Sequence, residues 1–369
     1  MRNLILILLF LISIVTASGQ TGPAGVGSAL NNLLWLDANQ MGLNDNDAVA
    51  TWLDISGNVN HATQITGSKQ PIFKVNQVNN LPSVQFDGSN DNLELTTHIT
   101  TSAITFFIVY KHDNSTQDGV FNVQKHALTD KANLAYLMSL TPTSTHYVTK
   151  PSNLFSIISS RSSALGAGTR IQISNNGSLR LSNRADFLSL SKSIIGSRWK
   201  TNNTADTYLD GDISELIIYD EDLSLAERTI ILESLGAKYN FTVSPGIYSY
   251  KATHPNDVIG IGMESDGSNT SAKGRGSITI SNPSSLSTGD YLLIGHDGGA
   301  FTTSVDVPLG TAQRFNRTWR VDETGETGTL DIQFDLGANG FSADGNYVLL
   351  IENNDGVFNN GDVVNYVSG

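Results

Sequence analysis

The chain has 369 residues, no cysteine and a formal net charge of −13, from 22 Lys and Arg against 35 Asp and Glu. This balance, without any basic stripe, argues against a nucleic-acid partner and against docking on an anionic membrane, because both need clustered Lys and Arg. The lack of cysteine excludes disulfides, thiolate catalysis and cysteine-ligated zinc.

The chain begins with a pattern typical of a secretory signal peptide. Arg2 precedes the apolar run 4–15, and the small residues Ala17 and Gly19 fit a cleavage site after residue 19. The alternative is an N-terminal membrane anchor, but this run is shorter than the roughly 18 residues that a spanning helix needs. We therefore expect residues 1–19 to be removed, with no membrane insertion after cleavage. The mature chain is then secreted, extracellular or displayed on a bacterial cell surface.

The part of the chain up to residue 242 consists mainly of short apolar segments with strand-like alternation, bounded by Gly, Asn, Asp or Ser. The clearest segments are 83–86, 104–110, 170–173, 178–181 and 215–219. Asn176-Gly177 predicts a tight hairpin between two of them, because both residues tolerate positive φ. One helix is predicted to run to about Tyr239, because Ser224 and Glu227 form a capping box at its start.

Pro245-Gly246 then marks a domain boundary, and residues 245–369 contain no convincing helix. We expect an all-β protein of two domains, a β-sandwich over 28–242 and a second, smaller β-sandwich over 245–369. The sequence leaves open whether the second domain is truncated and the chain a fragment of a longer protein.

Three sequence blocks occur in order in the first region. They are 34–39 with 49–64, then 82–93, then 209–219 with the capped helix that follows. On these blocks, residues 28–242 resemble the bacterial laminin-G-like family, within the concanavalin A-like jelly rolls. The resemblance implies a jelly-roll fold but no ligand, because this fold carries lectins, glycosidases and inert spacers.

The second region carries three further signatures, 252–262, 291–298 and Arg317-Thr318-Trp319-Arg320-Val321. With them it is similar to an uncharacterised module that often follows such domains in large secreted proteins of Bacteroidetes-type bacteria.

Several acidic turns are candidates for structural Ca²⁺, which takes six to eight oxygen ligands. Asp87 and Asp91 flank a turn after a strand, Asp210 and Asp212 precede another strand, and Asp355 lies in an Asn- and Gly-rich segment. The alternative at each position is a plain turn, because Asp and Asn also stabilise turns without a metal.

The segment 210–215 is also the place where a glycoside hydrolase would carry its carboxylates. The concanavalin-like glucanases place alternate carboxylates on one strand, facing the cleft. Asp210 and Asp212 would share a face, but Glu215 would need a β-bulge to join them. The match is therefore partial, and the retaining mechanism would lack its Glu nucleophile.

Tryptophan side chains are candidate sugar-stacking platforms. Trp35 and Trp52 lie in apolar segments and are expected in the core, whereas Trp199 lies between Arg198 and Lys200, before Asn202-Asn203. Trp199, Asn202 and Asn203 therefore form the candidate ligand-binding set. His61 is expected to be a hydrogen-bonded turn residue rather than a catalytic base.

These observations favour a non-catalytic binding or adhesion module that takes a glycan or a surface protein as partner. The alternatives are a glycoside hydrolase that uses the carboxylates of 210–215, and an inert structural spacer.

Overall fold

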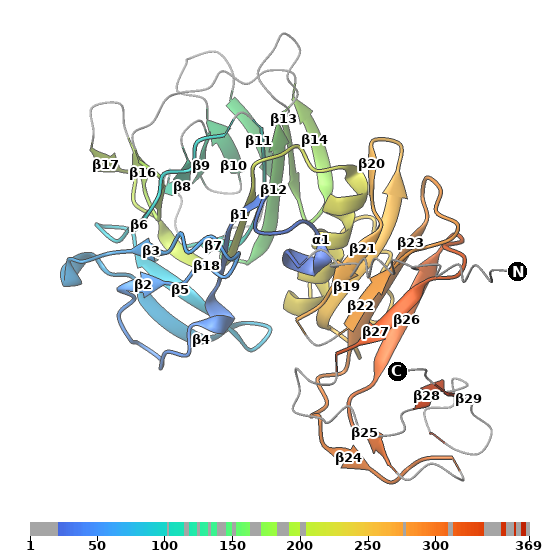
Figure 1. Ribbon diagram of the computed structural model, residues 1–369. Coiled ribbons are helices and arrows are strands. Elements are labelled where there is room, and N and C mark those ends of the chain that lie inside the picture. The colour runs from blue at the N-terminus through green and yellow to red at the C-terminus, as the bar shows by residue number, and fades with distance from the viewer. Residues whose placement is uncertain are drawn as a thin grey trace, which may run out of the picture.

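The computed structural model describes residues 21–101, 103–113, 118–123, 126–131, 134–138, 145–149, 153–162, 171–182, 192–199, 204–275, 278–308, 313–335, 348–351, 358 and 363–366. Figure 1 shows two groups of strands with one helix between them.

Two antiparallel sheets of eight strands each form the first sandwich. The first, sheet A, contains, in spatial order, β14 (Ser178–Ser182), β13 (Ile171–Asn175), β12 (Ser156–Ser162), β7 (Ile104–His112), β18 (Asp210–Tyr219), β5 (Leu81–Asp87) and β4 (Ile72–Val78), with β1 (Asn32–Asp37) also paired to β18. The second, sheet B, contains β11 (Thr145–Thr149), β10 (Leu134–Met138), β9 (His126–Lys131), β8 (Asp118–Val123), β15 (Ile194–Ile195), β6 (Leu93–Leu95), β3 (Ala62–Thr63) and β2 (Thr51–Trp52).

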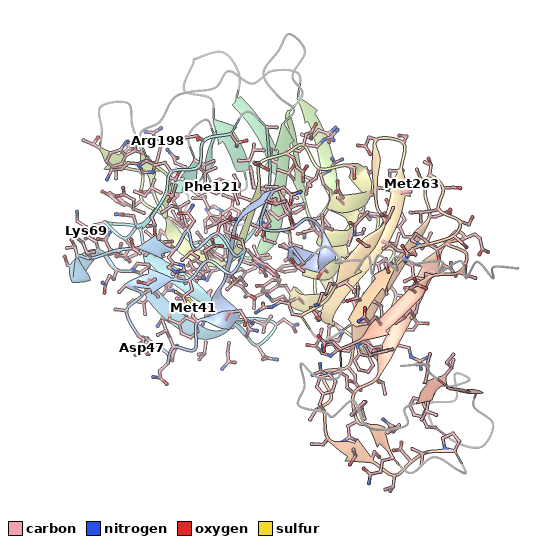
Figure 2. The ribbon with its side chains drawn as sticks, viewed as in Figure 1. Met41, Asp47, Lys69, Phe121, Arg198 and Met263 are labelled. Carbon is pink, nitrogen blue, oxygen red and sulfur yellow. The ribbon has the colours of Figure 1, made fainter. Side chains whose placement is uncertain are left out.

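The inner faces of these two sheets enclose one apolar core. Phe106 and Ile108 of β7 meet Phe121 of β8 there, and the rings of Phe106 and Phe121 pack edge to face with centroids 4.8 Å apart. Figure 2 shows Phe121 within the first sandwich. The predicted hairpin at residues 176–177 is confirmed: it joins β13 to β14, with φ of 47° at Asn176 and 82° at Gly177.

The helix predicted after Ser224 is also confirmed, as α1 (Leu225–Tyr239). Ser224 and Glu227 form the capping box, and Asn240 ends the helix in the left-handed conformation. Asp266, from the second region, accepts a hydrogen bond from the backbone N–H of Leu225 (3.0 Å) and so adds a second N-terminal cap.

The second region forms the smaller sandwich that the sequence predicts. Its four-stranded sheet contains β20 (Gly267–Asn269), β19 (Asn256–Glu264), β23 (Tyr291–His296) and β26 (Trp319–Thr324), and its three-stranded sheet contains β21 (Ser271–Lys273), β22 (Ile278–Ser281) and β27 (Asp331–Phe334). Ile259 and Ile261 of β19, Ile280 of β22 and Ile294 of β23 fill the space between them. The all-β class with two sandwiches is therefore confirmed.

Shorter elements complete the described part of the chain. They are the hairpins β16 (Arg198–Trp199) with β17 (Ala205–Asp206), β24 (Thr303–Ser304) with β25 (Arg314–Phe315) and β28 (Val348–Ile351) with β29 (Val363–Tyr366), and the 3-10 turns η1 (Pro23–Gly25), η2 (Ala38–Gln40) and η3 (Gly67–Lys69).

Helix α1 lies between the two sandwiches (Figure 1) and is buried by both. Ile230 and Ile231 belong to a second apolar cluster that joins Phe107 of β7 to Leu293 of β23. Glu233 accepts backbone hydrogen bonds from residues 246, 247 and 248, which holds the segment after the helix against it. The predicted domain boundary near residue 245 therefore lies in a segment that is tied to α1.

The segment 22–27 also lies at the junction of the two regions. Val26 is fully buried in the same cluster as α1, and its carbonyl accepts a hydrogen bond from the Tyr219 hydroxyl (3.0 Å). The Asn269 amide of the second region donates to the Gly25 carbonyl (3.3 Å). Among the described residues, no helix is long and apolar enough to cross a membrane.

Candidate functional site

The acidic turn after β5 and the start of β18 lie together at one end of the first sandwich. Asp210 is the register partner of Asp87, and the backbone N–H of Gly88 donates to the carbonyl of Leu209 (2.8 Å). Leu209 in turn donates to the carbonyl of Gly196, at the base of the β16–β17 hairpin. The structure thus brings three of the candidate metal ligands, Asp87, Asp91 and Asp210, to one rim.

The carboxylates of Asp87 and Asp91 accept hydrogen bonds from the backbone of their own turn. The Oδ1 of Asp87 accepts backbone hydrogen bonds from residues 89, 90 and 91, and the Oδ2 of Asp91 accepts one from Asp87 (3.1 Å). Burial, together with the charge of Asp87, raises the pKa of Asp91 to about 6. The Oδ1 of Asn90 is buried without a hydrogen-bond partner in the described part of the chain.

These donors are hard oxygens, which suit Ca²⁺, and a cation would offset the repulsion between Asp87 and Asp91. However, the described residues contain no group of three or more His, Asp or Glu side chains placed to hold a metal ion. The calcium site at Asp87, Asp91 and Asp210 therefore stays a prediction.

Asp212 occupies a different environment from Asp210. Its side chain is fully buried, it accepts a hydrogen bond from the Ser83 hydroxyl (2.7 Å), and it forms an ion pair with Lys111 (3.0 Å). In return, the pKa of Lys111 is raised: burial acts to lower it, but the hydrogen bond and charge of Asp212 prevail. This carboxylate is neutralised by the protein itself.

Glu215 faces the same side of sheet A as Asp212, because β18 has an irregularity between residues 213 and 215 in its pairing with β7. Ile213 and Leu216 consequently both point into the inner core, while Glu215 points outward towards α1. The β-bulge that the glycosidase alternative requires is therefore present.

The surroundings of Glu215 nevertheless leave no access for a substrate. Its oxygens accept hydrogen bonds from the Trp35 indole (2.7 Å), the Lys238 ammonium (2.7 Å) and the Tyr239 hydroxyl (2.8 Å). Lys238 also pairs with Asp37 (2.8 Å), and the Glu215 side chain is only 3% exposed. Burial raises the pKa of Glu215. Sequence reasoning missed this network, because nothing in the pattern of α1 shows which strand Lys238 faces.

The tryptophans divide as the sequence predicts. Trp35 and Trp52 are 8% and 0% exposed, which confirms that both belong to the core. Trp199 is half-buried on β16, with the Lys192 ammonium 4.9 Å from its ring centroid and its carbonyl accepting from Asn122. The neighbouring Arg198 forms a two-bonded ion pair with Asp206 (2.9 and 2.8 Å) and lies at the outer edge of the first sandwich in Figure 2.

His61 has the turn role expected of it, since its Nδ1 accepts the backbone N–H of Asp54 (3.0 Å). The remaining predicted residues, Asn202, Asn203, Asp355 and the signal peptide at 1–19, lie outside the described residues.

The three signatures of the second region converge in space, although the sequence assigned them no role. The Nε2 of His254 lies 3.1 Å from the Thr318 hydroxyl, which donates to Asp297 (2.8 Å), and the ring of His296 packs on Trp319. Register pairing of β23 with β26 explains this, because it places His296 opposite Trp319.

Residues 234–369 match the model of a domain of unknown function (DUF8202). The match begins within α1 rather than after it. It covers the second region, whose signatures resemble an uncharacterised module. No curated protein sequence matches the chain.

Several solved structures resemble parts of the chain at low similarity. The SAP-like pentraxin from Limulus polyphemus is 14% identical, with a TM-score of 0.34 over 40% of this chain and 79% of that chain. The Trypanosoma rangeli sialidase is 12% identical, with a TM-score of 0.36 over 60% of this chain and 35% of that chain. A GH54 α-L-arabinofuranosidase is 14% identical, with a TM-score of 0.34 over 61% and 58%. Scores this low add nothing to the fold described above and assign no activity.

Proposed function

We propose that the chain is a secreted, non-catalytic binding module that attaches to a glycan or a surface protein at the bacterial cell surface. The observation that carries this proposal is the state of the β18 carboxylates. The glycosidase alternative would use Asp210, Asp212 and Glu215, and two of these, Asp212 and Glu215, are buried in ion pairs with lysines. A general acid or nucleophile must instead reach the scissile bond.

The exposed features lie at the rim that carries Asp87 and the β16–β17 hairpin. Trp199 is half-buried there, and an aromatic side chain next to polar loops is typical of recognition surfaces. Its neighbours Asn202 and Asn203 belong to the same proposed surface. Structural Ca²⁺ held by Asp87, Asp91 and Asp210 would fix the adjacent turn.

The test is a glycan array, together with binding to intact bacterial and host cells, using purified residues 20–369 and the variant Trp199→Ala. We expect binding that Trp199→Ala weakens at least fivefold while circular dichroism stays unchanged. If residues 20–369 bind neither any glycan nor any cell surface, the binding proposal is wrong and the spacer alternative is favoured.

The glycosidase alternative has its own test, the release of reducing sugar from polysaccharides by wild type and Asp212→Asn. We expect no turnover by either protein. Turnover that is lost in Asp212→Asn would overturn the non-catalytic assignment.

The calcium component is tested by thermal unfolding with calcium and with chelator. We expect chelation to lower the Tm of wild type and to leave that of Asp87→Asn with Asp91→Asn unchanged. An equal Tm of wild type in both conditions would rule out structural calcium.

A further inference from the structure

One arginine of the second region, Arg317, is held in place by two neighbouring groups. The guanidinium of Arg317 stacks on the ring of Phe301, 4.1 Å from its centroid, and its Nε donates to the Gly299 carbonyl (2.8 Å). These two contacts fix the plane of the guanidinium and occupy its inner edge. Within the described part of the chain, its two terminal nitrogens make no hydrogen bond and no ion pair with the protein.

Burial lowers the pKa of Arg317, and the charges of Asp257 and Asp297 act against this shift without forming an ion pair with the guanidinium. The backbone N–H of Arg275 donates to Asp257 (3.0 Å). Asp297 accepts hydrogen bonds from the backbone and hydroxyl of Thr318 and from the backbone of Gly299. Asp306 pairs with Arg314 (2.6 Å). The terminal nitrogens of Arg317 therefore keep their hydrogen-bonding capacity for a partner from outside the described residues.

A guanidinium in this setting recognises oxyanions by a pair of parallel hydrogen bonds. Because stacking on Phe301 fixes the fork in advance, little side-chain entropy is lost when the anion binds. Phe301 and Trp319 are half-buried beside it, with ring centroids 6.3 Å apart, and offer apolar surface to the carbon skeleton of a ligand.

We propose that Arg317 and its aromatic neighbours bind the carboxylate or sulfate groups of an acidic polysaccharide. This inference rests on the proposed binding function and names its ligand class for the second region. We name a polysaccharide rather than a nucleic acid, because Arg317 is a single guanidinium beside two aromatic rings. Binding of a nucleic acid depends on clustered Lys and Arg, which this acidic chain lacks.

The test measures binding of residues 20–369 to dextran sulfate, to oligogalacturonate and to uncharged dextran by isothermal titration calorimetry. If Arg317 recognises sulfate groups, dextran sulfate should bind. If it recognises carboxylates, oligogalacturonate should bind. Uncharged dextran should not bind in either case. We expect Arg317→Gln to weaken binding of the preferred polymer at least tenfold. Arg317→Lys keeps the charge but loses the paired hydrogen bonds, and should weaken it about threefold to tenfold.

Arg314→Gln is the matched control, because Arg314 lies on β25, three residues before Arg317, but is already paired with Asp306. It should bind like wild type. His296 supplies a second readout, since burial and then the charge of Arg317 lower its pKa to about 4. An anion bound at Arg317 should raise the His296 pKa, measured by NMR titration, in wild type and not in Arg317→Gln.

The inference is overturned if Arg317→Gln binds as tightly as wild type, if dextran binds as well as the preferred acidic polymer, or if no acidic polymer binds at millimolar concentration. In those cases the chain could still bind a glycan through Trp199. Binding that is lost in Trp199→Ala but kept in Arg317→Gln would support the proposed binding function and contradict the role of Arg317.

Discussion

The two faces of sheet A are both buried, but they differ in character. The inner face is covered by sheet B and meets it with apolar side chains such as Phe106 and Ile218. The outer face is covered by α1 and the second region, and it adds buried charge, Glu215 with Lys238, to an apolar cluster that includes Phe107. The inner face therefore supplies the core of the first sandwich, and the outer face packs the second region against it.

The largest predicted effect tests whether the outer face of sheet A contributes as much to the free energy of unfolding as the inner face. Phe106→Ala and Phe107→Ala each remove a fully buried ring from adjacent positions of β7, one on each face. We expect each to lower the free energy of unfolding by about 3–5 kcal/mol, as is usual for buried Phe→Ala. Urea unfolding, monitored by tryptophan fluorescence and by circular dichroism, measures both.

The informative result is the ratio of the two losses. If the outer face were merely a contact between independent domains, Phe107→Ala would cost far less than Phe106→Ala and unfolding would show two transitions. One transition with similar losses would confirm a single cooperative unit.

The second prediction concerns the fit of residues 22–27 at the junction. Gly25 has φ of 73°, and a Cβ there would lie 2.4 Å from the Cβ of Ala272. Gly42 has a similar φ of 65° but no atom within 4 Å of its Cβ position, which makes it a matched control. We expect Gly25→Ala to cost about 2–4 kcal/mol from strain plus overpacking, and Gly42→Ala about 1 kcal/mol from strain alone. If urea unfolding gave equal losses of stability for the two variants, residues 22–27 would not pack against β21.

The buried ion pair of the outer face should matter less than its apolar residues. Glu215→Ala leaves Lys238 and the Trp35 indole without their shared acceptor. The usual loss for a broken buried pair is about 3–5 kcal/mol. Because the Lys238 side chain keeps 25% exposure and still pairs with Asp37, we expect about 2–3 kcal/mol.

Glu94→Ala is the control for this change, because Glu94 pairs with Lys192 in an ion pair whose side chains are 38% and 34% exposed. It should cost less than about 1 kcal/mol in the same urea experiment. Equal losses for the two variants would contradict the buried network as a determinant of the junction.

The contrast between the two faces of sheet A also shows which features could be predicted from the sequence and which could not. The run 104–110 identifies a strand, and its nearly continuous apolar residues, with Thr105 as the exception, are typical of a strand buried on both sides. The capping box and the Asn-Gly turn were predictable because their chemistry is local. What covers the outer face was not predictable, because Lys238 meets Glu215, and Asp266 meets Leu225, only through long-range packing.

In the candidate site, too, local features could be predicted from the sequence and long-range contacts could not. Sequence spacing places Asp87 and Asp91 in one turn, and the register of β5 with β18 then adds Asp210. No spacing shows that Asp212 pairs with Lys111, because that contact depends on the alignment of β7 with β18. Arg317 was visible only as part of a signature, since its partner Phe301 lies on another segment.

The last predicted effect is a pH dependence of opposite sign in the two regions. Burial and the charge of Asp87 raise the pKa of Asp91 to about 6 from 3.8, so the folded state holds a proton that the unfolded state has lost. The contribution of Asp91 to stability therefore falls as pH rises from about 4 to about 6. His296 has a pKa lowered from 6.5 to about 4, so the unfolded state binds the proton first and the contribution of His296 rises over about pH 4 to 6.5.

Differences in Tm between wild type and single variants isolate these two contributions, measured in chelator at half-unit steps from pH 4 to 7. The Tm of Asp91→Asn should rise relative to that of wild type as pH rises. His296→Asn keeps an acceptor for the Gly298 backbone N–H. Its Tm should fall relative to that of wild type over the same pH interval. Because the two regions unfold together if the outer face is a true core, both slopes must appear in the same transition. A His296 slope confined to a separate, earlier transition would show instead that the second region unfolds without the first.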